Sequence, residues 1–196
     1  MKYKNKVFEG ATFPDAPIKR NMRIDFNNYM RTEYIPIIDS IEANKGVKLL
    51  AIIMANKEGF YKGTRSYRTN NPANIGNTDN GRNVGFKTLR LGIEAQIYYI
   101  QRVALGKHSS YPLGKDVYLK PYFSPEIAKN QKTYGIEPYV PGYKFKYIGE
   151  LEQFVKIYST GARSGNGYLS MIISFFENHG IHIDEKTTLA EIIEIK

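Results

Sequence analysis

The sequence predicts a mainly α-helical domain that carries a small β-hairpin flap, an α+β fold. Apolar residues recur at intervals of three and four in several segments, which is the spacing of helices with one buried face. The stretch 63–85 is instead dense in glycine and asparagine and contains Asn80-Gly81, a strong signal for a two-residue hairpin. The 196 residues suffice for one buried core, and 42% hydrophobic with 24% charged residues is usual for a soluble domain.

The first predicted helix begins near Glu33, where Thr32 is placed to cap its N-terminus. Pro36 fits the first turn, because the N–H that proline lacks has no helical partner there. Residues 44–46, which include an asparagine and a glycine, are expected to end this helix.

Two further helices follow from the apolar spacing. One covers about 48–57 and closes at Gly59, and the other covers about 89–105 and ends at Gly106. Glycine is common just after a helix because it adopts positive φ freely. The inward-facing positions of these two helices are Leu49, Ile52, Ile53, Ile93, Ile97, Ile100 and Ala104.

The remainder of the chain divides into a loop region and more helices. Residues 107–149 are rich in tyrosine, proline and glycine, and they predict a long ordered loop with one short helix near 125–130. Helices are expected over about 150–158 and 167–178, and a short acidic element over 188–194.

We therefore expect three parts in the chain. Residues 1–32 have no sustained period and predict an N-terminal arm that lies on the domain as extended chain or short strands. Residues 33–180 form the main domain, and residues 181–196 form a C-terminal tail or short helix. The start of the chain lacks the apolar stretch of about 7–15 residues that a secretory signal needs. The longest apolar run, 49–55, is far shorter than the roughly 20 residues that span a bilayer, so neither a signal peptide nor stable membrane insertion is expected.

Composition excludes some classes of function and leaves others open. There are no cysteines, and the three histidines form no HExxH pair, so we expect no metal and no cofactor. The net charge of +9 points to an anionic partner, and residues 56–107 hold nine basic but three acidic residues. Nucleic acid, anionic lipid and a bacterial cell wall all carry such charge. A nucleic-acid partner is disfavoured because the 16 tyrosines do not recur in a recognisable module.

Glu58 is the candidate that carries chemistry. It ends the apolar helix predicted over 48–57, where the chain turns into the polar flap. The helix dipole disfavours an anion at that end, and an apolar wall penalises the charged form, so both raise the pKa of the carboxyl group. A carboxylic acid that keeps its proton near neutral pH is suited to protonating a glycosidic oxygen. The alternative is a solvated helix-end glutamate without function.

Three motifs follow one another in this part of the chain. They are Glu58-Gly-Phe60, Asn70-Asn-Pro-Ala-Asn-Ile75 and Phe86-Lys-Thr-Leu-Arg-Leu-Gly-Ile-Glu-Ala-Gln96. Their order resembles that of lysozyme-superfamily muramidases, glucosaminidases and lytic transglycosylases, in forms found in phages and Bacteroidetes-type bacteria. A later block, 158–168, resembles the segment that closes the far side of the groove in these enzymes. The likeness spans about 46–178 and implies a lysozyme-like helical domain behind an N-terminal extended arm.

The resemblance implies roles for individual side chains. Glu58 would be the general acid. Tyr158 and Tyr168 would stack on sugar rings or steady the acid. The flap would line the groove and bind N-acetyl groups and hydroxyls, a task that suits asparagine because its amide both donates and accepts. The flap residues implied are Arg68, Asn70, Asn71 and Asn74.

A second carboxylate decides how the cleaved bond is completed. Inverting and covalent retaining glycosidases both need one, whereas a lytic transglycosylase does not, because a hydroxyl of the sugar itself attacks. Asp79 is the best-placed acid of the flap, and we take it as the catalytic candidate beside Glu58. Its setting at the tip of the predicted hairpin also suits a turn residue that makes local hydrogen bonds, and the sequence slightly favours this alternative.

Two functions follow from these expectations. The first is an enzyme that cuts the glycan strands of peptidoglycan for phage-type lysis or wall penetration. It would stay in the host cytoplasm before its release to the cell wall, or it would be part of the virion. The second is a non-catalytic virion or wall-binding protein on the same scaffold, with other virion proteins as partners. Loss of wall lysis on substitution of Glu58 separates the two.

Overall fold

The computed structural model describes residues 3–10, 13, 17–76, 83–165 and 167–196. Helix accounts for 46% of the structure and strand for 10%, which confirms the mainly α, α+β class. The helical elements are η1 (Met30–Tyr34), α1 (Ile35–Asp39), α2 (Lys45–Lys57), α3 (Arg65–Arg68), α4 (Leu89–Ala104), α5 (Pro125–Tyr134), α6 (Leu151–Tyr158), η2 (Thr160–Ser164), α7 (Tyr168–Glu177) and α8 (Leu189–Glu194). The strands are β1 (Val7–Glu9), β2 (Asp116–Leu119), β3 (Tyr122–Phe123), β4 (Tyr139–Val140) and β5 (Gly142–Lys146).

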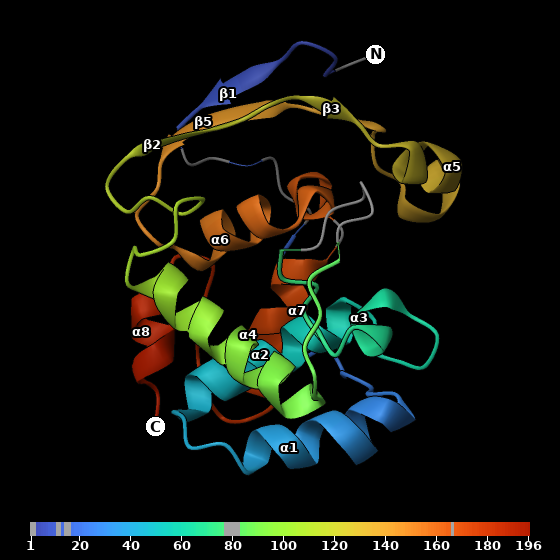
Figure 1. Ribbon diagram of the computed structural model, residues 1–196. Helices are drawn as coiled ribbons and strands as arrows, with labels where there is room; N and C mark the ends of the chain where they lie inside the picture. Colours follow the sequence, from blue (N-terminus) through green and yellow to red (C-terminus); the bar gives the residue numbers. More distant parts are fainter. Residues whose placement is uncertain (1–2, 11–12, 14–16, 77–82, 166) are drawn as a thin grey trace.

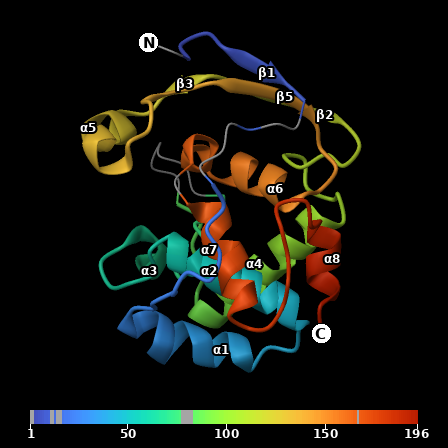
Figure 2. The ribbon, with the colours of Figure 1, turned by 180° about the vertical axis from the view of Figure 1, so that it is seen from behind.

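The elements form a sheet end and a helical body. The strands lie at one end of the molecule, with α6 directly beneath them (Figure 1). Helices α2, α4 and α7 form the body, and α1 lies at the opposite end, an arrangement that is also visible from behind (Figure 2). Among the described residues, no helix is long and apolar enough to span a bilayer.

Helix α2 is the centre of the core. It contacts α1, α4, α7 and α8, so little of its surface reaches solvent. A helix that is apolar around its whole circumference is stable only inside a protein. Its buried residues are Gly46, Val47, Leu49, Leu50, Ala51, Ile52, Ile53, Met54 and Ala55.

The start of α2 differs from the prediction that residues 44–46 break the helix. Asn44 is the N-cap, and Gly46 lies in the first turn. A Cβ on Gly46 would come within 1.9 Å of the Ile192 carbonyl oxygen in α8. The glycine is therefore a close contact between two helices and not a helix end. The other predicted end is confirmed, because Gly59 has φ +74° directly after the helix.

The first helical segment begins earlier than Glu33, inside the predicted arm. Thr32 is not an N-cap: it lies within the π-helical turn η1, and its hydroxyl donates to the Asn28 carbonyl at 2.9 Å. Ile35 donates its backbone N–H to the Met30 carbonyl, five residues back. Pro36, at the start of α1, has no N–H for an α-helical bond, which accounts for the wider turn before it.

The arm is fastened at two places. Strand β1 pairs in parallel with β5, with Val7 opposite Gly142. Further along, the Lys19 backbone N–H donates to the Ser170 hydroxyl at 2.9 Å, and Arg20 forms an ion pair with Glu177. The first contact holds the arm on the sheet, and the later two hold it against α7.

The prediction of a long loop over 107–149 is wrong. This region contributes β2 and β5 to a three-stranded sheet ordered β1-β5-β2, and β3 and β4 to a two-stranded one. Along β5 and just after it, Tyr143, Phe145 and Tyr147 are buried, while Lys144 and Lys146 between them are exposed. This period of two is that of a strand with one covered face. The predicted short helix is present as the longer α5.

The predicted flap is a loop held by asparagine side chains in its described parts. The hairpin signal Asn80-Gly81 lies outside the described residues. Residues 61–76 and 83–88 on either side contain α3 and no strand. The Asn71 amide donates to the Ile75 carbonyl at 2.9 Å and to the Val84 carbonyl at 3.1 Å, which ties the two sides of the loop together.

The other helices follow the predicted pattern. Helix α4 buries Ile93, Ile97, Ile100 and Ala104, and α6 and α7 lie where the apolar spacing places them. The C-terminal element docks as α8, with a capping box between Thr188 and Glu191.

We expect Gly92→Ala to destabilise the protein, although alanine favours helix by about 1 kcal/mol over glycine. A Cβ at this position of α4 would lie 1.7 Å from the Asn70 carbonyl oxygen of the flap loop. Overpacking of this kind costs about 1–3 kcal/mol, and urea unfolding measures the change. The control is Ala95→Gly in the same helix, which should lose about 1 kcal/mol. A Gly92→Ala variant more stable than the parent would contradict the close approach of loop and helix.

Candidate active site

Glu58 is delivered to the edge of a cavity by the end of α2. Its backbone N–H still bonds to the Met54 carbonyl at 2.9 Å, and the chain turns away at Gly59. The half-buried side chain lines a cavity of about 620 Å³, a volume typical of ligand sites. The predicted candidate therefore lies at a cavity and not on an open helix end.

The cavity is bounded by three parts of the fold. The flap loop forms one wall. The C-terminal end of α6, together with the start of η2, forms a second wall. Helix α4 and the segment that follows it form the third. Its described lining residues are Glu58, Arg65, Ala73, Asn74, Ile75, Gly76, Tyr99, His108, Ser110, Tyr111, Ile157, Tyr158, Ser159 and Thr160.

The pKa of Glu58 is raised, in the direction that the sequence predicts. Burial is the largest cause, because it disfavours the charged carboxylate. A hydrogen bond from Asn74 and the positive charges of Lys57 and Arg65 oppose the increase without cancelling it. The side chain is therefore an acid that holds its proton to higher pH than an ordinary glutamate.

Asn74 links the acid to a cation. Its amide nitrogen donates to Glu58 Oε2 at 3.2 Å, and its carbonyl oxygen accepts from Arg65 Nε at 3.3 Å. Asn74 has φ +51°, a left-handed conformation that asparagine tolerates better than most residues. Arg65 begins α3, which Thr64 caps by accepting the Tyr67 N–H. These contacts place Arg65 at the cavity.

Two tyrosines lie beside the acid in different ways. Tyr158 lines the cavity and donates its hydroxyl to the Ala73 carbonyl. Tyr168 is fully buried behind it, with the two ring centroids 6.2 Å apart. Burial raises the pKa of both hydroxyls, and a negative charge on Glu58 raises each further. Both therefore stay neutral and provide a weakly polar wall next to the carboxyl group.

The end of the cavity away from α3 is aromatic. Tyr99 donates its hydroxyl to the Tyr111 hydroxyl at 2.8 Å. The ring of His108 lies edge-on to both tyrosines, at 5.1 and 5.4 Å between centroids. Burial and the nearby Arg102 lower the pKa of His108, so its imidazole is neutral at pH 7. Aromatic faces with neutral polar edges suit sugar rings, which present both C–H faces and hydroxyls.

Several residues predicted to bind substrate have other roles. Asn71 is fully buried, and its side chain forms hydrogen bonds with backbone groups of the flap loop. The Asn70 amide donates to the Phe86 carbonyl at 3.0 Å. Arg68 is exposed and does not line the cavity. Asp79 lies outside the described residues. Of the predicted set, Glu58, Asn74 and Tyr158 meet at the cavity.

Arg65 and the aromatic end of the cavity were not predicted from the sequence. The only local signal for Arg65 is Thr64, which begins a one-turn helix and so fixes where the arginine points. Tyr99 lies within α4, and His108 and Tyr111 follow Gly106, the glycine that ends this helix. No spacing rule connects these residues to Glu58, because they meet only in the folded chain.

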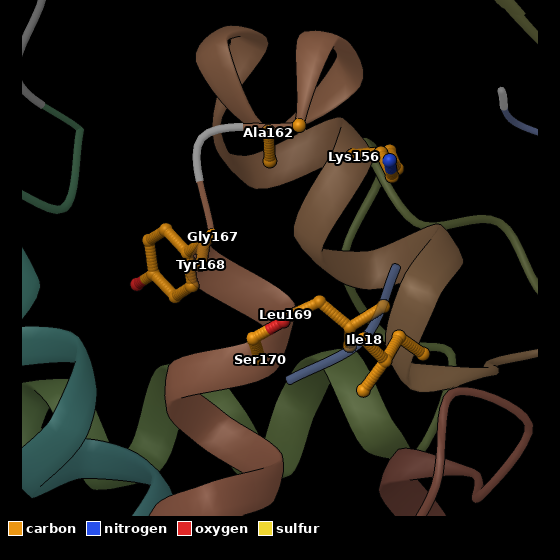
Figure 3. Close-up of a pocket in the computed structure, with 8 residues that line it drawn as sticks. Ile18, Lys156, Ala162, Gly167, Tyr168, Leu169 and Ser170 are labelled. Carbon is orange, nitrogen blue, oxygen red and sulfur yellow. The ribbon is translucent and has the colours of Figure 1, made fainter. Parts of the chain in front are cut away.

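A second cavity lies behind Tyr168 and is much smaller. Its volume of about 30 Å³ has room for about two water molecules, too little for a sugar ring. Figure 3 shows that the Tyr168 hydroxyl points away from Ile18 and Lys156, which line this cavity. The larger cavity is thus the candidate active site. Among the described residues, no three histidine, aspartate or glutamate side chains gather into a group that could hold a metal ion.

The chain was compared with protein-family models, with curated proteins and with solved structures, and none of the three comparisons gave a match. The candidate site combines a half-buried acid, an amide that contacts it, a cation behind the amide, and an aromatic wall.

We expect Glu58→Gln to become progressively more stable than the parent as the pH rises above about 4.5, the ordinary pKa of glutamate. The pKa of Glu58 is higher in the folded than in the unfolded protein. The parent therefore keeps its full stability at pH values below the pKa of Glu58 in the unfolded state. It loses part of this stability as the pH rises toward the pKa of Glu58 in the folded state. Urea unfolding of both proteins at a series of pH values measures the difference.

The control for this experiment is Glu191→Gln, for which the trend should be reversed. Backbone and hydroxyl hydrogen bonds from Thr188 lower the pKa of Glu191, so the parent loses that stability as the pH falls. If the stabilities of the two variants relative to the parent changed with pH in the same direction, burial would not disfavour the charged form of Glu58.

We expect Arg65→Gln to raise the pKa of Glu58 further, whereas Arg68→Gln leaves it unchanged. Both arginines belong to α3, but only Arg65 contacts Asn74 and contributes its charge at the acid. NMR titration of the carboxyl carbon of Glu58 measures the shift. An equal effect of both substitutions would mean that Arg65 acts only through net charge.

Proposed function

We propose that this protein cleaves the glycan backbone of bacterial peptidoglycan, with Glu58 as the general acid. One observation carries the proposal: a half-buried carboxyl group of raised pKa lines a cavity of about 620 Å³ that opens beside aromatic and amide side chains. A raised pKa favours the protonated form that a general acid needs. The order of the three sequence motifs supports the same class of substrate.

The proposed reaction begins with proton transfer. The Glu58 carboxyl gives its proton to the glycosidic oxygen, the bond from that oxygen to the anomeric carbon breaks, and positive charge develops on the sugar. The carboxylate left behind is stabilised by the Asn74 amide and by the charges of Lys57 and Arg65. Burial thus keeps the proton on the acid beforehand, and the polar partners support the anion afterwards.

The described lining residues favour a route that needs one carboxylate. Glu58 is the only acidic side chain among them. We therefore propose that a hydroxyl of the same sugar attacks the anomeric carbon, gives its proton to the Glu58 carboxylate, and leaves a 1,6-anhydro end. Hydrolysis with Asp79 holding a water molecule is the alternative, and the two routes give different products.

The charge of the chain fits an anionic wall. The net charge of +9 would concentrate the protein on a polymer that carries carboxylates and phosphates. We propose phage-type lysis or wall penetration as the setting, with the protein acting from the host cytoplasm or from the virion. Peptidoglycan glycan strands are then its principal partner.

We expect Glu58→Gln to lower the rate of peptidoglycan cleavage by at least about 10²-fold, the usual contribution of general acid catalysis. Loss of turbidity of purified peptidoglycan measures the rate. Glu191→Gln, which makes the same chemical change in α8, should leave the rate unaltered. Undiminished cleavage by the Glu58 variant would remove the assignment, and binding of the wall by the parent without product would favour a non-catalytic scaffold.

We expect the products to end in a 1,6-anhydro sugar. Mass spectrometry of the released muropeptides distinguishes this end from a reducing end by the mass of one water molecule. Reducing ends would show that water attacks, and would direct the search for a second carboxylate to Asp79.

A further inference from the structure

Helix α4 carries an apolar stripe on its outer side. Leu91 is 45% exposed, Tyr98 is 62% exposed, and Leu105, the residue that follows α4, is 53% exposed. These residues are seven positions apart, and seven residues bring a helix back to within about 20° of the same face. Helix α4 lies on the front of the molecule in Figure 1. Large apolar side chains that share one exposed helix face are able to form the apolar part of a protein–protein contact.

The charges beside the stripe are arranged so that one copy of α4 is complementary to a second, antiparallel copy. Glu94 precedes Tyr98 by four residues, and Arg102 follows it by four. If a second copy of α4 lies antiparallel across the first with Tyr98 at the centre, Glu94 of each copy lies level with Arg102 of the other. The same alignment brings Leu91 level with Leu105 of the second copy. A two-fold contact requires this kind of self-complementarity.

The two charged residues do not satisfy each other within one chain. They are eight positions apart, which is about 12 Å along a helix. Glu94 contacts Arg90 at 3.6 Å on the same exposed face, and Arg102 lies over the ring of Tyr98, 5.8 Å from its centroid. The exposed Glu94–Arg90 pair contributes little in water, so Glu94 gives it up at little cost. Arg102 already donates from Nη2 to the Lys107 carbonyl at 2.6 Å, and its other guanidinium N–H groups remain for a partner across the interface.

We propose that this protein forms a two-fold symmetric dimer through antiparallel packing of α4. The two Tyr98 rings meet at the symmetry axis, the leucines cover them at either end, and two Glu94–Arg102 pairs flank the apolar row. One helix pair buries less than the roughly 1,600 Å² of a standard interface, so the dimer is weak. Like charge on the two chains also opposes association, and salt near 0.15 M screens this long-range repulsion. The dimer does not depend on the proposed peptidoglycan activity.

Sedimentation equilibrium of the full chain from about 10 μM to 1 mM at about 0.15 M salt tests the proposal. We expect Tyr98→Glu to weaken association by at least about tenfold, because it places two like charges at the axis. Tyr61→Glu is the matched control, since Tyr61 is 50% exposed but lies outside α4, and it should leave association unchanged. A parent that stays monomeric over the whole range overturns the proposal.

Charge exchange tests the antiparallel alignment. Glu94→Arg and Arg102→Glu should each weaken the dimer, because each variant creates two like-charged contacts with its own copy. An equimolar mixture of the two variants should associate like the parent, since both contacts are then between opposite charges. The variant with both substitutions should do the same. Circular dichroism confirms that each variant is folded. A mixture that associates no better than its components overturns the alignment.

Discussion

The whole structure depends on one constraint, the burial of α2 on nearly every side. Four helices contact it, so its apolar circumference is satisfied only when all of them are in place. The helix must also end where the core ends, and Gly59 ends it there. Glu58, the residue before this glycine, consequently lies at the boundary between the core and the cavity. Its raised pKa is a consequence of that position, since burial is the largest cause.

The surroundings of Glu58 balance two requirements that oppose each other. A proton donor must be kept neutral before it reacts, and the anion that it becomes must then be stabilised. The neutral tyrosines Tyr158 and Tyr168 serve the first requirement, because they place rings and not charges beside the carboxyl group. Asn74 serves the second, and Arg65 holds its amide in position. The acid is thus connected to a cation through one polar group and not through direct contact.

Much of the helical architecture could be predicted from the sequence, because apolar spacing reports which face of a helix is buried. Helices α4, α6 and α7 follow this rule, and so does Glu58 at the end of α2. The sheet could have been found from the alternation of Tyr143 to Tyr147, although the surrounding prolines and glycines mask it. Gly46 could not have been placed, because its neighbour Ile192 is remote in sequence. Arg65 and His108 were missed for the same reason: their proximity to the acid is a property of the folded chain.

The parallel pairing of β1 with β5 bears on the order in which the molecule is assembled. Val7 finds its partner in Gly142, about 135 residues later, so β1 has no strand neighbour until that intervening stretch has been synthesised. Contacts between residues so far apart in sequence form slowly, because a large loop must close before the contacts contribute any stability. Until then the edge of β5 remains open to any extended segment that can offer backbone hydrogen bonds. The helical body is completed later still, because α7 and α8, which cover α2, follow β5 in the chain.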